Sequence, residues 1–161
     1  MFVVVPEHVS KENCSYLIDI FKNLYKDRGL PWRDTVRLNL ADYGEPDRDE
    51  FINYLSELFC QYFQNHIEMI EVVRWPEHSY MKEHFDTARE STTRTSITYL
   101  NDDYEGGQTC VPSEKFCVNP KVGTTVFFDG QKYKHCVKQV KNGTRYTLAI
   151  WYTDDINLKI I

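Results

Sequence analysis

Residues 135–152 read HCVKQVKNGTRYTLAIWY, the pattern of two strands joined by a turn. Two short runs rich in Val, Thr, Tyr and Ile flank Asn142-Gly143, a pair typical of a tight hairpin between two strands. In a strand, successive side chains point to opposite faces of the sheet. The face that begins with Arg145 also carries Thr147, Ala149 and Trp151. The other face carries Tyr146, Leu148, Ile150 and Tyr152, so we expect it to pack in a core.

Runs of the same kind fill the chain from Ile67 onward. We expect strands at Glu68–Trp75, Ser79–Asp86, Arg94–Leu100, Gly107–Val111, Thr124–Phe128, Cys136–Val140 and Thr144–Tyr152. Short strands separated by turn residues at this spacing are typical of a sandwich or barrel of the jelly-roll kind.

The first third of the chain reads as helical. Ser10 can cap a helix from Lys11 to about Lys26, and a second helix is expected from about Pro46 to Asn65. Their apolar stripes are Cys14, Leu17, Ile18, Phe21, Leu24 and Tyr25 in the first helix, and Phe51, Tyr54, Leu55, Leu58, Phe59, Tyr62 and Phe63 in the second. A short extended piece at Val36–Leu40 separates the helices. Helices first and strands after exclude an alternating βαβ fold.

We therefore predict a single α+β domain, mainly β, over residues 1–161. A helical part, about residues 1–66, would brace a jelly-roll core, about residues 67–155. A chain of this length can bury a sizeable core. Apolar residues make up 42% of it, which is typical of a globular protein.

Charge and cysteine content narrow the functional classes. The net charge of −5 disfavours a nucleic-acid partner. No apolar run approaches the roughly 18 residues of a membrane span, and we see no secretory leader, so we expect a cytoplasmic protein without a membrane partner. There are five cysteines and no Cys-x-x-Cys pair. Reduced thiols are the simplest interpretation, with a Cys110–Cys117 bridge as the alternative.

The chemistry of the chain concentrates in three residues. His84 and Asp86 stand two positions apart in an expected strand, so their side chains could point at one spot, with Phe85 turned to the core. His135 begins a later strand. Two histidines and a carboxylate leave metal positions open, which is the arrangement of non-heme Fe(II) oxygenases. Arg145 shares its strand face with Ala149 and Trp151, which is unusual for a face turned to solvent, and a co-substrate carboxylate would satisfy its charge.

Several motifs occur in a family-like order and spacing between about Arg74 and Tyr152. They are His84-Phe85-Asp86; Tyr99-Leu100-Asn101; Tyr104-Glu105-Gly106-Gly107-Gln108-Thr109; Pro120-Lys121-Val122-Gly123 followed by Phe127; His135-Cys136-Val137; and Arg145 through Trp151. Together they resemble the prolyl 4-hydroxylase branch of the 2-oxoglutarate- and Fe(II)-dependent dioxygenases.

The resemblance implies a double-stranded β-helix, the jelly roll inferred above. His84, Asp86 and His135 would bind Fe(II). The co-substrate 2-oxoglutarate would be held by Arg145, Tyr99, Thr147 and Trp151. The activity implied is hydroxylation of a prolyl residue in a peptide or protein, as in procollagen-proline 4-dioxygenases. It uses O2, releases succinate and CO2, and has L-ascorbate as a helper.

Some positions depart from the family pattern, and other functions stay open. Trp75 stands at a usual tyrosine and His78 at a usual glycine, while His8, His66 and His78 are expected at the surface or at caps. The segment Thr87–Thr93 is either a substrate lid or a plain loop. Alternatives are an oxygenase of the same superfamily acting on nucleic acid or a small molecule, a cupin-like jelly roll that only binds, and a zinc protein. Nucleic-acid demethylases usually carry a second arginine where Trp151 stands.

Overall fold

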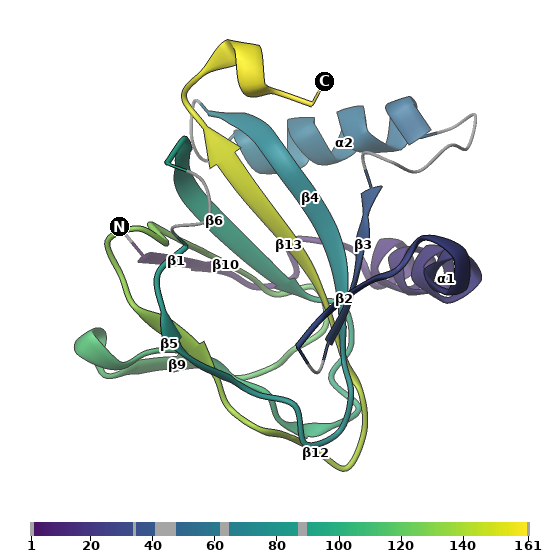
Figure 1. Cartoon of the computed structure of the whole chain (residues 1–161), viewed down its shortest axis with the longest axis vertical. Helices are drawn as coiled ribbons and strands as arrows, with labels where there is room; N and C mark the ends of the chain where they lie inside the picture. The colour runs from purple at the N-terminus through teal and green to yellow at the C-terminus, as the bar shows by residue number, and fades with distance from the viewer. Residues whose placement is uncertain (1, 34, 41–47, 62–64, 87–89, 161) are drawn as a thin grey trace.

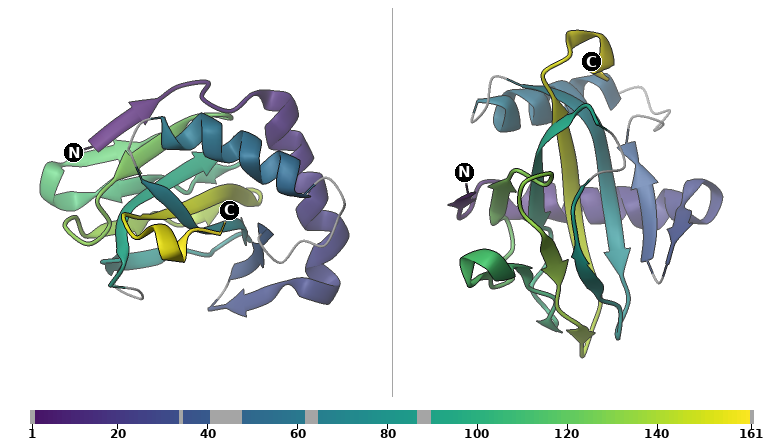
Figure 2. Two further views of the ribbon diagram at one scale, coloured as in Figure 1. Left: turned by 90° about the horizontal axis from the view of Figure 1, so that it is seen from above. Right: turned by 60° about the vertical axis from the view of Figure 1, so that its left-hand side comes forward.

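The computed structural model describes residues 2–33, 35–40, 48–61, 65–86 and 90–160. It has three layers, in which two helices cover one face of a large antiparallel sheet and a smaller sheet faces the other (Figures 1 and 2). This is the mainly β jelly-roll architecture predicted from the sequence. None of the described helices is long and apolar enough to span a membrane.

The described residues form seven strands in the large sheet and four in the smaller one. Across the large sheet the order is β1 (Phe2–Val5), β10 (Thr125–Phe128), β6 (Thr92–Tyr99), β13 (Arg145–Thr153), β4 (His66–Trp75), β3 (Thr35–Asn39) and β2 (Leu30–Trp32). Across the smaller sheet it is β5 (Met81–His84), β11 (His135–Val137), β8 (Thr109–Val111) and β9 (Phe116–Val118). A further pair joins β12 (Val140–Lys141) to β7 (Glu105–Gly106), and short 3-10 turns lie at Pro112–Glu114 and Ile156–Leu158.

Helix α1 (Lys11–Arg28) begins where the sequence predicted. The Ser10 hydroxyl accepts the backbone N–H of Asn13 at 3.1 Å and satisfies one of the free donors of the first turn. The N–H of Gly29 closes the last turn on the Tyr25 carbonyl. Within the predicted stripe, Cys14, Leu17 and Phe21 are fully buried against the large sheet.

Helix α2 (Arg48–Cys60) buries Ile52, Leu55 and Phe59, while Tyr54 of the predicted stripe is exposed. The predicted start near Pro46 and the stripe residues Tyr62 and Phe63 lie outside the described residues, as does the side chain of Phe51.

The alternation predicted for the last strand is present in β13, the central strand of the large sheet. Tyr146, Leu148, Ile150 and Tyr152 belong to the apolar core beneath the helices. Each buried Leu or Ile there contributes about 1.5–3 kcal/mol to stability. Arg145, Thr147, Ala149 and Trp151 face the space between the two sheets. The strand thus separates the structural core from the cavity.

The prediction of a hairpin at Asn142-Gly143 is wrong, because the two strands that flank this turn do not pair with each other. The chain does turn there, with Asn142 at φ 52°, but the strand before it pairs with β7 while β13 pairs with β4 and β6. The turn therefore carries the chain from one sheet to the other. Glu77 holds it by accepting the Asn142 N–H at 2.8 Å.

The expected helical part also contributes strands. β1 and β2 form the two edges of the large sheet, and neither was predicted; β9 at the edge of the smaller sheet was also missed. His8 caps α2, as expected, because its Nε2 lies 3.2 Å from the Leu58 carbonyl in the last turn of that helix. Its ring also lies against Phe59 and Phe127 and contacts the Thr125 hydroxyl at 3.0 Å.

The cysteine interpretation also changes. Cys110 and Cys117 face each other across β8 and β9 and form a disulfide, so the chain does not have five reduced thiols. Cys14, Cys60 and Cys136 are free.

Candidate metal and co-substrate site

A cavity of about 410 Å³ opens between the two sheets. All three tryptophans of the chain, Trp32, Trp75 and Trp151, line it. Its charged lining residues are Arg33, Arg37, Glu71, Asp86 and Arg145, together with the imidazoles of His84 and His135. An apolar cleft with a few convergent polar groups is the usual form of a ligand site.

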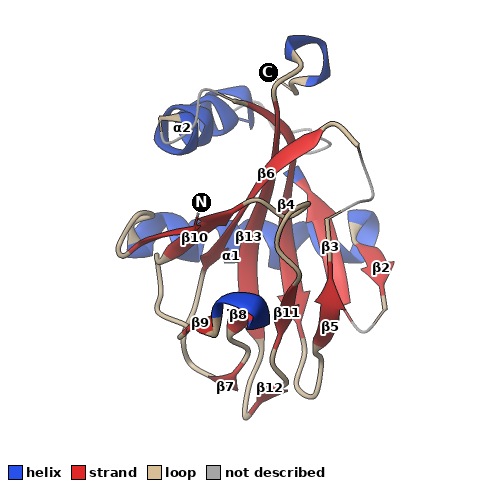
Figure 3. Ribbon diagram, turned by 90° about the vertical axis from the view of Figure 1, so that its left-hand side faces the viewer, coloured by secondary structure: helices blue, strands red, loops and turns tan. Residues whose placement is uncertain are grey.

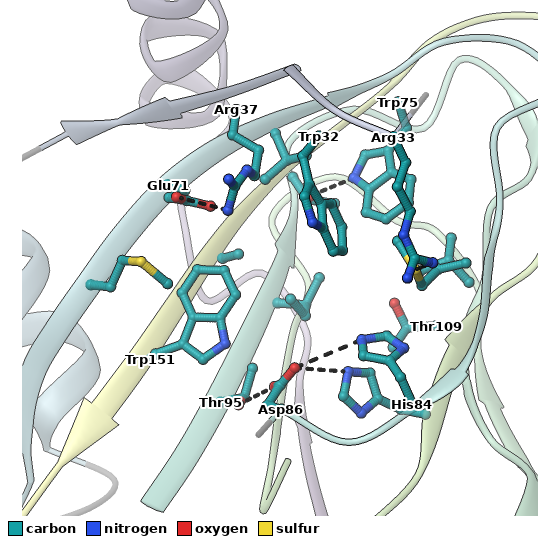
Figure 4. A pocket seen from close by; sticks show the side chains of 18 of the residues that line it. Trp32, Arg33, Arg37, Glu71, Trp75, His84, Asp86, Thr95, Thr109 and Trp151 are labelled. Atoms are coloured by element: carbon teal, nitrogen blue, oxygen red, sulfur yellow. Dashed lines mark hydrogen bonds and ion pairs between the residues drawn. The ribbon is translucent and has the colours of Figure 1, made fainter. Parts of the chain in front are cut away.

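The three residues singled out in the sequence meet at one end of this cavity. The strands β5 and β11, which carry the two histidines, lie side by side (Figure 3), and His84 lies beside Asp86 (Figure 4). His84, the last residue of β5, pairs directly with His135, the first residue of β11. Asp86 follows two positions later, held by its N–H bond to the Gly130 carbonyl at 2.8 Å. The Oδ1 atom of Asp86 lies 3.7 Å from Nε2 of His84 and 3.5 Å from Nε2 of His135. All three candidate ligand atoms lie within 4.8 Å of one another.

Backbone carbonyls next to the two histidines fix the orientation of their rings. Nδ1 of His84 lies 2.9 Å from the Lys82 carbonyl, and Nδ1 of His135 lies 3.2 Å from the Tyr133 carbonyl. Because a carbonyl can only accept, each Nδ1 must carry the hydrogen, which leaves the Nε2 lone pair toward the cavity. Support of this kind is typical of metal-binding histidines.

The Asp86 carboxylate is aimed in the same way. The Thr95 hydroxyl donates to Oδ2 of Asp86 at 2.6 Å, which leaves Oδ1 directed at the two imidazoles (Figure 4). A carboxylate held at one oxygen presents the other as a ligand.

The electrostatics favour the protonation states that a metal requires. Burial lowers the pKa of His84, and the nearby His135 lowers it further. For Asp86, burial raises the pKa, but the hydrogen bond and charge of His135 outweigh this and the net pKa lies below the usual value. A neutral imidazole and an ionised carboxylate are the coordinating forms.

Arg145 lies deeper in the cavity and is 1% exposed. Its Nη2 donates to the Thr109 hydroxyl at 3.1 Å, and its guanidinium lies 4.8 Å from the Trp75 ring centre and 5.3 Å from that of Tyr99. Nε and Nη1 are buried, and among the described residues they have no hydrogen-bond partner. A buried charge with unused donors is strongly unfavourable, so the guanidinium fits a ligand carboxylate bound end-on, by Nη1 and the second hydrogen of Nη2.

Comparison with known proteins decides the family. Residues 70–153, just over half of the chain, match the profile of the 2OG-Fe(II) oxygenase superfamily. The chain belongs to this superfamily. A search of curated protein sequences finds no match.

Solved structures agree on the fold. The viral collagen prolyl hydroxylase from Paramecium bursaria chlorella virus 1, in its 2OG complex, is 21% identical, with 96% of each chain covered and a TM-score of 0.75. A prolyl-4-hydroxylase from Pseudomonas putida is 17% identical, with 96% of this chain and 92% of that chain covered and a TM-score of 0.76. A prolyl hydroxylase from Trichoplax adhaerens, in complex with a hypoxia inducible factor peptide fragment, is 18% identical, with 95% and 83% covered and a TM-score of 0.77.

The residues present in this oxygenase fit iron and 2-oxoglutarate. Two imidazoles and one carboxylate converge from one side and leave the cavity side open, which suits Fe(II) bound with a second ligand. The buried donors of Arg145 lie in the same cavity and suit the far carboxylate of a dicarboxylic acid.

Of the other residues predicted to hold the co-substrate, two line the cavity and the third makes hydrogen bonds within the protein. Thr147 and Trp151 line the cavity, and the Thr147 hydroxyl accepts from the indole N–H of Trp75 at 3.2 Å. The Tyr99 hydroxyl, by contrast, donates to the Val118 carbonyl at 3.1 Å and accepts the Thr109 N–H at 2.8 Å. In this conformation it has no hydrogen left for a co-substrate, so the direct contact stays a prediction.

Gly107 of the Gly106-Gly107 pair lies close to Arg145. Gly107 has φ 62°, and a Cβ there would stand 2.8 Å from the Tyr104 ring and 3.0 Å from Cδ of Arg145. The close approach that glycine allows therefore shapes the pocket around the guanidinium.

One sequence expectation near the metal ligands is wrong, and a second falls partly outside the described residues. β5 ends at His84, so Phe85 does not alternate into the core; it is 37% exposed, with the Lys134 ammonium 5.4 Å from its ring centre. The proposed lid Thr87–Thr93 falls partly on residues 87–89, outside the described residues, and β6 already begins at Thr92.

Sequence reasoning missed the wall opposite the metal ligands. Trp32 and Arg33 come from the end of β2, and Arg37 of β3 pairs with buried Glu71 at 3.5 Å (Figure 4). Arg33 and Arg37 each lie 5.4 Å from the Trp32 ring centre. A tryptophan beside arginines in an otherwise polar segment was the available signal.

Proposed function

We propose that this 2OG-Fe(II) oxygenase hydroxylates prolyl residues in a peptide or protein and releases succinate and CO2. The observation that carries the proposal is the joint presence, in one cavity, of the His84–Asp86–His135 cluster and the unpartnered Arg145 donors. A metal site alone would suit a binding protein. The added carboxylate site is what a 2-oxoglutarate-consuming enzyme requires.

Each residue has a defined task in this proposal. His84 and His135 offer Nε2, and Asp86 offers Oδ1, to Fe(II). Arg145 binds the far carboxylate of 2-oxoglutarate and fixes the length and direction of the co-substrate in the cavity. Iron with 2-oxoglutarate and O2 supplies the oxidation that replaces a substrate C–H by C–OH.

The remaining cavity favours an apolar substrate group. Trp32, Trp75 and Trp151 offer ring faces, and Val73, Ile97 and Ala149 add aliphatic surface. A pyrrolidine ring is compact and apolar, and it could lie against such rings beside the metal. The Trichoplax neighbour binds a peptide fragment, which supports a peptide rather than a free small molecule as the substrate.

Turnover tests the proposal. The protein is supplied with Fe(II), 2-oxoglutarate, ascorbate and O2, and succinate is measured with and without a panel of proline-containing peptides. We expect peptide-dependent succinate and a peptide mass gain of about 16 Da on proline, one oxygen atom by this chemistry. Asp86→Ala is the control that should abolish both.

The alternatives predict other results. A binding jelly roll or a zinc protein would form no succinate under any condition. An oxygenase with another substrate would form some succinate without peptide but leave every proline unmodified. Either result would contradict the prolyl assignment, and the first would contradict the enzyme itself.

A further inference from the structure

Three cysteines stand in a row across three neighbouring strands of the smaller sheet. Cys136 of β11 pairs with Cys110 of β8, and Cys110 pairs in turn with Cys117 of β9. Cys110 and Cys117 form the disulfide, and Cys136 is a free thiol beside it. The oxygenase chemistry described above uses none of them.

All three side chains belong to the outer face of this sheet. Directly opposed residues of an antiparallel pair point to the same side, and neighbours along a strand point to opposite sides. Thr109, His135 and Val137 line the inner cavity, so Cys110 and Cys136 point outward. A second hollow, of about 640 Å³, lies on this outer side, and Cys136 lines it together with Tyr80, Lys82 and Lys138. Cys117 is exposed.

The spacing suits a bridge on either side of Cys110. The Lys138 N–H donates to the Gln108 carbonyl at 3.0 Å, two residues along from the Cys136–Cys110 pair. Since the ladder pattern repeats every second residue, Cys136 and Cys110 form a pair of the hydrogen-bonded type, whose Cα atoms lie about 5.5 Å apart. Disulfides span Cα separations of roughly 4.4–6.8 Å. A Cys110–Cys136 bridge therefore fits the Cα spacing of the strands and needs only a local adjustment that brings the two Cβ atoms to within about 4.5 Å.

We propose that Cys136, Cys110 and Cys117 form a thiol–disulfide exchange site, in which the bridge passes between Cys110–Cys117 and Cys110–Cys136. The Cys136 thiolate attacks Sγ of Cys110, and the Cys110–Cys117 bond breaks. Cys117 leaves with the electron pair and takes up the proton that Cys136 gave up. One S–S bond replaces another, so the step needs no oxidant or reductant.

The exchange changes what the bridge connects. In the present form it closes the β8–β9 edge of the sheet. In the exchanged form it ties β8, which carries the Thr109 partner of Arg145, to β11, which carries His135. It also releases Cys117 as an exposed thiol that other thiols can reach. The exchange site thus links thiol chemistry at the surface to two strands that line the cavity. This inference does not depend on the substrate being prolyl.

Alkylation followed by peptide mapping tests this exchange. The air-oxidised protein is incubated with iodoacetamide at mildly alkaline pH and digested with trypsin without reduction. Cleavage after Lys115, Lys121 and Lys134 places the three cysteines on separate peptides. We expect alkylated Cys117 and a linked Cys110–Cys136 peptide pair in the natural protein. In Cys136→Ser, Cys117 should stay linked to Cys110 and unlabelled, whereas Cys60→Ser should behave as the natural protein.

A second variant keeps the inference falsifiable. In Cys117→Ser, oxidation should join Cys110 to Cys136, seen as the same linked peptide pair. Equal labelling of Cys117 with and without Cys136, or no labelling in either protein, would overturn the exchange. Free thiols at both Cys110 and Cys136 in oxidised Cys117→Ser would overturn it as well.

Discussion

Replacing Arg145 by alanine should weaken 2-oxoglutarate binding strongly. Among the described residues, Nε and Nη1 have no hydrogen-bond partner, and a carboxylate would engage Nη1 together with the second hydrogen of Nη2. Loss of one partner of a buried charge pair costs about 2–5 kcal/mol, which corresponds to an increase in Kd of about 30-fold to several thousand-fold. The fold should survive, because the lost Thr109 hydrogen bond and ring contacts are offset by the removal of a buried charge that lacks a carboxylate partner among the described residues.

Tryptophan fluorescence provides the assay. All three tryptophans line the cavity, so their emission reports co-substrate binding directly. The titration uses 2-oxoglutarate with Mn(II)-loaded protein, which avoids turnover. Arg74→Ala is a matched control, since Arg74 belongs to the next strand and lies 5.2 Å from the Tyr25 ring centre, outside the cavity. A Kd for Arg145→Ala within twofold of the natural protein, or an equal loss in Arg74→Ala, would refute the reasoning.

Three further substitutions probe the site and the fold. Thr95→Val removes the 2.6 Å hydrogen bond to Asp86 and should weaken Mn(II) binding by about 10- to 100-fold in a calorimetric titration; unchanged affinity would count against that support. Gly130→Ala places a Cβ against Oδ2 of Asp86 and should weaken the same binding, while retained affinity would show that the carboxylate can shift. Burial lowers the pKa of His8 from 6.5, so its contribution to stability is complete above about pH 6.5 and is lost as pH falls toward the folded-state pKa. His8→Gln should therefore reduce the drop in the unfolding free energy of the metal-free protein between about pH 7.5 and 5.5, measured by denaturant titration, and an unreduced drop would contradict this sign.

Local signals in the sequence predicted the elements that local physics determines. Ser10 marked the start of α1 because a cap acts within one turn. The alternation after Arg145 predicted both faces of β13, since a central strand between a core and a cavity repeats with period two. The convergence of His84, Asp86 and His135 followed from the known requirements of a metal, without any knowledge of strand pairing.

Features that depend on distant partners could not be predicted in this way. β1 and β2 are short edge strands, whose pairing with β10 and β3 leaves little pattern in their own residues. Asn142-Gly143 predicted a turn correctly but did not predict which strands pair on either side of it. A turn sequence specifies that the chain reverses, and not which sheet the next strand joins. The Cys110–Cys117 bridge required the register of β8 and β9. The wall formed by Trp32 and Arg33 required the packing of β2 across the cavity.

Anaerobic iron binding tests the central claim most directly. The metal-free protein is titrated with Fe(II), and the visible absorbance that appears on adding 2-oxoglutarate is recorded for the natural protein, Asp86→Ala and His135→Ala. The account predicts one iron per chain and a 2-oxoglutarate-dependent band in the natural protein, and neither in the two variants. Full iron binding and an unchanged band in either variant would contradict it.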